Sequence, residues 1–516
     1  MADLFAWSNF FTPLFPKLSL GIALPAWGQT APILAATHEL DADSAALVLP
    51  GVLLSLVVVY LASKIGGELS NKLGFPPVLG ELVTGVIVGV SALHLLVFPE
   101  SGAQSADSLI IQLLQTTAGL NPESAEAVFN AQSEVVSVLS ELGVIVLLFE
   151  IGLESNIRHL MAVGYQATIV ACVGVAVPFA AGTAGLMLLF GVPAIPAIFA
   201  GAALTATSIG ITSKVLSEIG RLSTKEGQII LGAAVIDDVL GIIVLAVVAS
   251  LAKTGEVDVM NVIYLIVSAT VFLLGSILLG SFFHNSFIRI ANVLKTRGGL
   301  LIPALVFAFL MSYLGAVIHL EAILGAFAAG LVLDESDETL ELQKLVLPIS
   351  DMLVPVFFVC VGAKTDIGVL NPAVPTNQEG LIIAVFLIAV AIIGKVVTGA
   401  AVFGEGKMNR LAIGVGMIPR GEVGLVFAGI GSASGALSKP LEAAIIMMVI
   451  ITTFIAPPLL RIVFKDEPAL VPESGSPSFN GHNQSPSLLE SEMVKQGLSQ
   501  KPLAEQPEQA SNLSKE

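Results

Sequence analysis

Long apolar stretches alternate with short polar segments over most of this chain, from about residue 46 to about residue 463. Each stretch approaches the roughly 20 residues that an α-helix needs to cross a bilayer, and exceeds the roughly 10 residues of a membrane-barrel strand. The pattern therefore predicts an all-α polytopic membrane protein with about thirteen spanning helices. The expected spans are residues 46–63, 77–97, 134–153, 163–190, 194–213, 226–251, 259–283, 299–318, 320–333, 346–363, 380–403, 410–432 and 439–460.

Basic residues are unevenly distributed between these spans, which predicts an orientation. Alternate loops on one side carry 14 lysines and arginines, and the opposite side carries 4. Because cytoplasmic loops are enriched in Lys and Arg, we expect the amino terminus outside and the carboxyl terminus in the cytoplasm, which requires an odd number of spans. The 14 are Lys64, Lys72, Arg158, Lys214, Arg221, Lys225, Arg289, Lys295, Arg297, Lys344, Lys407, Arg410, Arg461 and Lys465; the 4 are Lys17, Lys253, Lys364 and Lys439.

Two terminal segments fall outside the predicted membrane domain at 46–463. Residues 1–45 contain a moderately apolar stretch that prolines and a lysine interrupt, so we expect an extracytoplasmic segment, signal-like or interfacial, rather than a span. Residues 464–516 are dominated by Ser, Gln, Glu, Pro and Asn, which predicts a disordered cytoplasmic tail. That tail is too short for a nucleotide-binding domain and lacks the glycine fingerprint of one.

Composition narrows the function classes. The chain is 55% hydrophobic and 12% charged, against about 25% charged residues in soluble domains. Its net charge of −17 argues against nucleic-acid binding. The two cysteines have no metal-ligand spacing, and the sequence shows no nucleophile–base pair and no phosphate-binding loop. We therefore expect neither an enzyme nor a bound cofactor, and no nucleotide or nucleic-acid partner.

Two adjacent carboxylates, Asp237 and Asp238, lie in the middle of the apolar run 230–245. A charged side chain at the bilayer centre costs at least ~2.5–3.5 kcal/mol, so the pair needs partners or a purpose. One interpretation is a buried pair neutralised by hydrogen bonds, because neighbouring helical side chains point about 100° apart. The other, which we favour, is a site that exchanges protons for a cation within the membrane.

Lys395 also lies deep within an apolar span. It could extend to the interface along its aliphatic stem, but about twelve apolar residues precede it. Pairing with Asp237 or Asp238 is the better hypothesis. The ammonium would hold one aspartate ionised, and such a pair could exchange protons as a cation arrives or could be purely structural.

Two predicted spans carry signals of interruption. The fifth contains the hydroxyl-rich segment 203–212, with Thr205, Thr207 and Ser208; these hydroxyls either bond back to helix carbonyls or mark a broken helix. The twelfth contains Arg420 and Glu422 beside a proline and several glycines, which favours unwinding. Interrupted helices in corresponding positions of two halves are the best sequence indication of a transporter binding site, and hydroxyl and carbonyl oxygens suit a hard monovalent cation.

Five motifs occur in order along the chain, at Pro77–Leu82, Gly143–Glu154, Ile236–Asp238, Pro355–Val359 and Pro419–Glu422. Together they resemble the second family of monovalent cation:proton antiporters over residues 46–463. The nearest relatives in pattern are bacterial sodium/proton antiporters and the membrane half of glutathione-regulated potassium efflux systems. The latter carry a nucleotide-binding regulatory domain, which the tail of this chain does not resemble.

The resemblance implies a fold of about thirteen helices in inverted repeats, with two crossed, interrupted helices, assembled as a homodimer. It implies that Asp238 carries cation and proton alternately, as the transient ligand of the transported cation. Asp237 would be its partner, salt-bridged to Lys395 in the absence of cation. Arg420 and Glu422 would balance the charges of the core.

Exchange of Na⁺ for H⁺ across a lipid bilayer is therefore the expected function. Electroneutral family members tend to carry asparagine at position 237, so Asp237 with Lys395 implies electrogenic exchange. K⁺/H⁺ exchange or K⁺ efflux is the nearest alternative, since selectivity depends on cavity size and oxygen geometry. A gated channel would need a filter segment or charge ring, and an organic-solute symporter would lack the Asp-Asp and Lys combination. The composition favours a bacterial inner membrane and is also compatible with a thylakoid or organellar membrane.

Overall fold

A computed structural model describes residues 42–155, 157–254, 258–278, 293, 298–333, 339–370, 375–402, 408–433 and 435–465 of the protein. Within these ranges all regular structure is helical and no strand occurs, which confirms the predicted all-α class. Seven of the helices described are long and apolar enough to cross a membrane. Most of the amino-terminal segment 1–45 and nearly all of the tail 464–516 lie outside the described residues, so these two predictions stay predictions.

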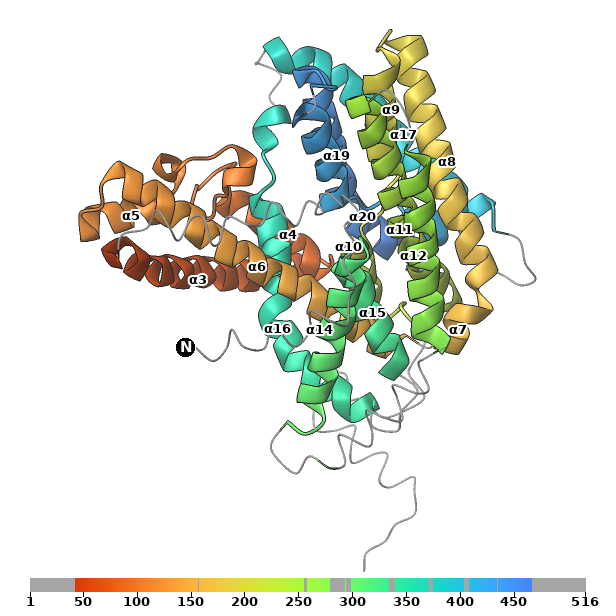
Figure 1. The fold of residues 1–516 in the computed structure, drawn as a ribbon, viewed down its shortest axis with the longest axis horizontal. Coiled ribbons are helices and arrows are strands. Elements are labelled where there is room, and N and C mark those ends of the chain that lie inside the picture. Colours follow the sequence, from red (N-terminus) through yellow and green to blue (C-terminus); the bar gives the residue numbers. More distant parts are fainter. Residues whose placement is uncertain are drawn as a thin grey trace, which may run out of the picture. The chain divides into compact units, whose positions relative to one another are not determined.

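Every predicted span corresponds to one helix or to a pair of short ones (Figure 1). Helices α5 and α7 fall outside the predicted spans. The bounds of the described helices are α3 Ala42–Lys72, α4 Pro77–Val88, α5 Leu109–Ala118, α6 Pro122–Glu154, α7 Ile157–Ala162, α8 Gly164–Leu189, α9 Ala194–Ala203, α10 Ile209–Glu218, α11 Lys225–Thr254, α12 Val259–Leu278, α14 Leu301–Val317, α15 Ala322–Leu333, α16 Thr339–Ala363, α17 Pro375–Ala400, α18 Arg410–Gly416, α19 Glu422–Ala433 and α20 Lys439–Val463, with short 3₁₀ turns at Pro99–Ser101, Ser105–Asp107 and Ile367–Leu370.

Several boundaries differ from the sequence-based expectation. Helix α6 begins at Pro122 rather than near 134, because the Asn121 side chain accepts a hydrogen bond from Ser124 N and the proline occupies the first helical position. Helices α4 and α15 have 12 residues each, about 18 Å, which is less than the ~30 Å hydrocarbon core. The count of thirteen spans and the inverted-repeat relation therefore stay predictions.

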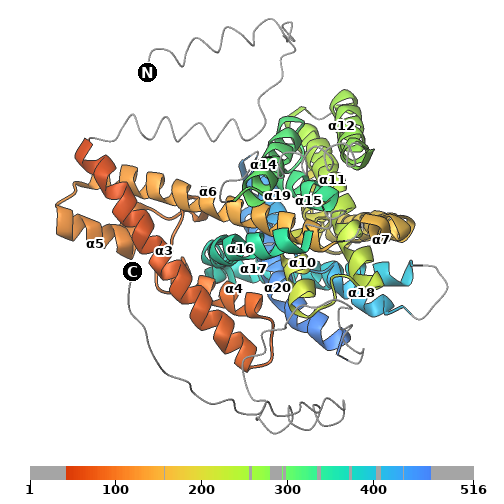
Figure 2. The ribbon, with the colours of Figure 1, turned by 90° about the horizontal axis from the view of Figure 1, so that it is seen from below.

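The helices pack as two groups. The first, which we call the α6 group, consists of α3, α4, α6, α14, α15 and α16, with α6 packed against α3, α15 and α16. The second, the α11 group, consists of α8, α9, α11, α17, α18, α19 and α20, with α8 packed against α9, α11 and α17. In Figures 1 and 2, α3, α5 and much of α6 extend away from the α11 group. The groups meet where α10 and α20 contact α4 and α10 contacts α6.

Glycines bring α6 and α15 into direct backbone contact. A Cβ atom added at Gly330 would lie 2.4 Å from the Phe149 carbonyl oxygen, and one added at Gly152 would lie 2.5 Å from that of Phe327. Since no side chain tolerates these distances, small residues at both positions allow the close approach that stabilises membrane helix pairs. This contact fixes α15, and with it the turn that precedes α15, against the α6 group.

Candidate functional site

Two helices are interrupted at the same place in the fold. Residues 204–208 separate α9 from α10, and residues 417–421 separate α18 from α19. The amide of Ser208 donates a hydrogen bond to the Pro419 carbonyl at 2.9 Å, so one break contacts the other directly. Pro419 favours the second break because proline removes a helix donor. The prediction of two crossed, interrupted helices is confirmed.

Hydroxyl groups complete the contact between the two breaks. Thr207 Oγ1 donates to the Met417 carbonyl at 3.2 Å, and Thr212 Oγ1 donates to that of Gly416 at 3.1 Å. Both acceptors are carbonyls that the end of α18 leaves without helical partners. The hydroxyl-rich segment thus satisfies the backbone of the second break, and the two interruptions stabilise each other.

Arg420 brings a positive charge into this crossing. Its side chain is fully buried, and Nη1 donates hydrogen bonds to the carbonyl oxygens of Thr205, at 3.3 Å, and Ala206. Thr453 Oγ1 in turn donates to the Arg420 carbonyl. The guanidinium, which belongs to the second break, therefore links the two breaks by donating to two carbonyls of the first break.

The two aspartates of α11 occupy different surroundings. Asp237 Oδ2 accepts a hydrogen bond from Lys395 Nζ of α17 at 3.1 Å, and both side chains have 0% exposure. Gly174 of α8 leaves room for the ammonium, since a Cβ there would lie 3.2 Å from Nζ. Asp238 points about 100° away around the helix axis, as expected for the next residue, and is 4% exposed.

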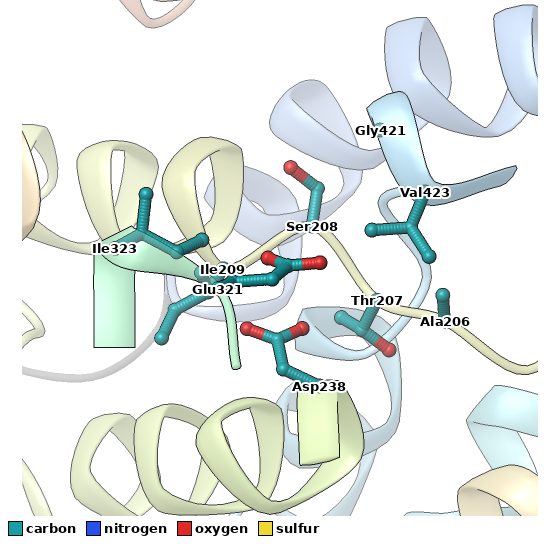
Figure 3. Close-up of a pocket in the computed structure, with 9 residues that line it drawn as sticks. All are labelled: Ala206, Thr207, Ser208, Ile209, Asp238, Glu321, Ile323, Gly421 and Val423. Atoms are coloured by element: carbon teal, nitrogen blue, oxygen red, sulfur yellow. The ribbon is translucent and has the colours of Figure 1, made fainter. Parts of the chain in front are cut away.

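Asp238 borders a small pocket with room for about one water molecule. Figure 3 shows its carboxylate next to that of Glu321, which precedes α15, whereas the hydroxyl of Thr207 in the first break is directed away from Asp238, toward the Met417 carbonyl to which it donates. The pocket thus lies where the crossing of the α11 group meets the α6 group. It is lined by Ala206, Thr207, Ser208, Ile209, Asp238, Glu321, Ile323, Gly421 and Val423.

The structure separates the predicted site residues into two sets. Thr207, Ser208 and Asp238 line the pocket, whereas Asp237, Lys395 and Arg420 are buried beside it. Thr205 is also fully buried and does not line the pocket, and its hydroxyl donates to the Ala202 carbonyl at 2.8 Å, the back-bond that hydroxyls in helices commonly make. The Glu422 side chain lies outside the described residues.

Glu321 was not among the residues that the sequence singled out. It lies at the start of the predicted span 320–333, a position at which a carboxylate is expected to lie at the membrane interface. A signal was present, however: 14 residues extend about 21 Å, too little to cross the ~30 Å core. One end of such a helix has to lie inside the membrane, and a charged residue at that end is a candidate site residue.

The pocket has two carboxylates and two hydroxyl-bearing residues, Thr207 and Ser208, in its wall, with cationic side chains buried beside it. Such oxygens are the ligands that hard cations prefer. A carboxylate can also take up a proton in place of a cation, and the paired Lys395 and Asp237 neutralise each other close by. In the described part of the chain, no group of His, Cys, Asp and Glu side chains forms a resident metal site. The arrangement suits transient binding of a small cation.

Solved structures support the fold. A structure of the sodium proton antiporter MjNhaP1 from Methanocaldococcus jannaschii superposes with a TM-score of 0.55 at 17% identity, and the match covers 82% of this chain and 98% of that one. At this identity the likeness concerns the fold alone.

Two sequence relatives are more similar to this chain than that structure is. The chain is 63% identical over 456 residues to the high-affinity Na⁺/H⁺ antiporter NhaS3 of Synechocystis, covering 88% of this chain and 96% of that protein. It is 32% identical over 414 residues to the Na⁺/H⁺-K⁺ antiporter GerN of Bacillus cereus, covering 79% and 95%. Residues 46–466 match the family described as sodium/hydrogen exchanger, transmembrane. The chain therefore belongs to the transmembrane sodium/hydrogen exchanger family.

Proposed function

We propose that this protein is a secondary-active antiporter that exchanges Na⁺ for H⁺, with Asp238 as the carboxylate that carries both. One observation carries this proposal: Asp238 is nearly buried and borders a pocket at the crossing of two interrupted membrane helices. Discontinuous helices commonly form the ion sites of secondary transporters. The choice of Na⁺ and H⁺ as the exchanged ions follows the names of two relatives, the Na⁺/H⁺ antiporter NhaS3 and the Na⁺/H⁺-K⁺ antiporter GerN.

Competition for one carboxylate gives the coupling. Ionised Asp238 binds Na⁺ together with the oxygens of Thr207 and Ser208, and protonated Asp238 does not. Because Na⁺ and H⁺ displace each other from Asp238, the site holds one or the other whenever it changes access from one side of the membrane to the other. Alternating exposure of the pocket to the two sides then links Na⁺ movement in one direction to H⁺ movement in the other.

The Asp237–Lys395 pair makes the exchange electrogenic in this proposal. When Na⁺ binds, the salt bridge between Asp237 and Lys395 breaks, and the buried lysine can then lose a proton. Two protons would then move for each Na⁺, counted as one from Asp238 and one from Lys395. Arg420, fixed on the carbonyls of the first break, supplies permanent compensating charge.

K⁺/H⁺ exchange is the second candidate, because the relative GerN is described as an Na⁺/H⁺-K⁺ antiporter. Selectivity between Na⁺ and K⁺ depends on the spacing and number of oxygen ligands. Family membership disfavours the gated-channel and organic-solute alternatives, and we expect no enzymatic activity.

We further propose a homodimer in a bacterial inner membrane, or in a thylakoid or organellar membrane, with the amino terminus outside and the tail at 464–516 in the cytoplasm. The loop charges support this orientation. The family resemblance supports the homodimer. Light scattering of the detergent-solubilised protein, corrected for bound detergent, measures the number of subunits directly.

Proton flux in inside-out vesicles tests the function. A respiration-generated pH gradient is established, and Na⁺, Li⁺ or K⁺ is then added to vesicles that contain wild type, Asp238→Asn or Asp258→Asn. The last is a matched control: Asp258 is exposed and accepts a hydrogen bond from Asn261 N, which an asparagine can preserve.

We expect Na⁺ to collapse the gradient in wild type and in Asp258→Asn, and to leave it intact in Asp238→Asn although that variant is folded and inserted. Collapse by K⁺ alone would instead favour the second candidate. Exchange that persists in Asp238→Asn would overturn the assignment of the carrier. No collapse by any cation in wild type would overturn the antiporter proposal.

A further inference from the structure

Glu321 stands at a sharp turn that the packing holds in place. His319 adopts a left-handed backbone conformation with φ of 65°, and the Leu320 amide donates to the Gly315 carbonyl at 3.0 Å. The chain therefore reverses within a few residues between α14 and α15. A Cβ at Gly325 would lie 2.2 Å from the Met311 carbonyl oxygen, so α14 and α15 are in backbone contact just beyond the turn. The position of the Glu321 backbone is fixed by this hairpin.

The two carboxylates of the pocket come from different helix groups. Asp238 belongs to α11, whereas Glu321 precedes α15, which packs against α6 and α14. In Figure 3 the Asp238 carboxylate is directed toward the end of the Glu321 side chain, and both residues line the pocket. Glu321 is half-buried and Asp238 is almost fully buried, so water screens their repulsion incompletely. Two facing carboxylates are stabilised when a cation or a proton lies between them.

We propose that Glu321 is a second carboxylate ligand of the transported cation, and that it contacts the cation in only one of the two access states. This inference rests on the proposed antiport and deepens it. Alternating access requires the pocket to change its surroundings, and the boundary between the α6 group and the α11 group passes between Glu321 and Asp238. When the groups shift relative to each other, Asp238 keeps the hydroxyls of its own group and loses Glu321.

The consequence is an asymmetry of cation affinity. The turn that carries Glu321 joins α14 to α15 on the side that the loop charges predict to be external. Glu321 thus strengthens Na⁺ binding at the external face and leaves binding at the cytoplasmic face to Asp238, Thr207 and Ser208. A ligand that binds one state more tightly than the other shifts the population toward that state.

The experiment compares Na⁺ offered to the two faces. The Na⁺ concentration for half-maximal exchange is measured in inside-out and in right-side-out vesicles that contain wild type, Glu321→Gln, Glu321→Asp or Glu341→Gln. The last is a matched control, because Glu341 is exposed in the first turn of α16 and does not line the pocket.

For Glu321→Gln we expect the half-maximal Na⁺ concentration to rise about tenfold at the external face, which corresponds to about 1.4 kcal/mol, and to change less than about twofold at the cytoplasmic face. The maximal rate should stay within about twofold, since the interaction lost is one of binding. Glu341→Gln should match wild type at both faces.

An equal rise at both faces, or none at either, would overturn the inference. If Glu321→Gln has no exchange at all, Glu321→Asp must restore Na⁺-dependent exchange with a raised external half-maximal concentration; failure to do so would also overturn it. Wild-type inactivity or retained exchange in Asp238→Asn identifies a failure of the proposed function, independently of Glu321.

Discussion

Lys395 Nζ lies 3.1 Å from Asp237 Oδ2, and neither side chain is exposed. The two residues are 158 positions apart in the sequence, on α17 and α11, so the contact joins two helices of the α11 group. Asp237 Oδ1 has no hydrogen-bond partner among the described residues. Lys395 is therefore the hydrogen-bonding partner that the structure gives Asp237, and Asp238, the next residue, faces the pocket.

Removal of one partner should destabilise the protein strongly. Lys395→Met or Asp237→Asn leaves the remaining charge buried without its counterion, which typically costs about 3–5 kcal/mol. The double variant Asp237→Asn/Lys395→Met removes both charges and should recover most of the lost stability. Thermal unfolding of the purified protein in detergent, followed by intrinsic fluorescence, measures the three differences.

The exposed pair Lys439–Glu442 provides the control, since its lysine side chain is 84% exposed. Lys439→Met should leave the unfolding temperature unchanged within error. If the double variant at 237 and 395 is as unstable as the sum of the two single variants, the residues do not interact as the structure indicates.

Charge movement tests the same pair in a different way. We expect exchange by Asp237→Asn/Lys395→Gln to become independent of the membrane potential, because the second proton per cycle would be lost. The measurement clamps the potential of proteoliposomes with K⁺ and valinomycin and records Na⁺-driven pH changes. Wild type should respond to the potential, and a double variant that responds equally would refute this role of Lys395.

Arg420 should matter through its hydrogen bonds as well as its charge. Arg420→Ala leaves the carbonyls of Thr205 and Ala206 without their guanidinium donor, and each unsatisfied buried carbonyl costs about 1–3 kcal/mol. Arg420→Lys keeps the charge and can reach one of them, so its loss should be smaller. Unfolding temperatures should rank wild type, Lys and Ala in descending order. The exposed Arg410 serves as control, and a loss for Arg410→Ala as large as that for Arg420→Ala would contradict the assignment.

Backbone contact between α6 and α15 predicts opposite effects for the same substitution at two glycines. Gly330→Ala should destabilise by about 1–3 kcal/mol, because the new Cβ would meet the Phe149 carbonyl at 2.4 Å and force the helices apart. Gly275→Ala in α12 meets nothing within 4 Å and should be neutral or stabilising by up to about 1 kcal/mol. Thermal unfolding of the two variants checks the contrast, which equal shifts would contradict.

Most of the helical architecture could be predicted from the sequence. Apolar segments of bilayer length predict helices, and Pro419 with its neighbouring glycines predicts the second interruption. Thr205, Thr207 and Ser208 all lie in the first interruption, which the hydroxyl-rich segment indicated, and the hydroxyl of Thr205 also forms the local back-bond that was the alternative. Helix ends were predicted less well, since α6 extends to a capped start at Asn121 beyond its apolar run.

The sequence by itself determined that this is an all-helical membrane protein with two carboxylates and a lysine inside its apolar segments. Helices that cross a membrane need long apolar runs, and a charged residue within such a run is therefore easy to identify. The residue pattern alone left open which aspartate pairs with Lys395, since both are adjacent on one helix. The family resemblance implied Asp237, and the tertiary structure shows this pair and places Asp238 at the border of a pocket. It also placed Glu321 opposite Asp238. That juxtaposition depends on glycine-mediated packing between helices distant in sequence, and no local pattern in the chain encodes it.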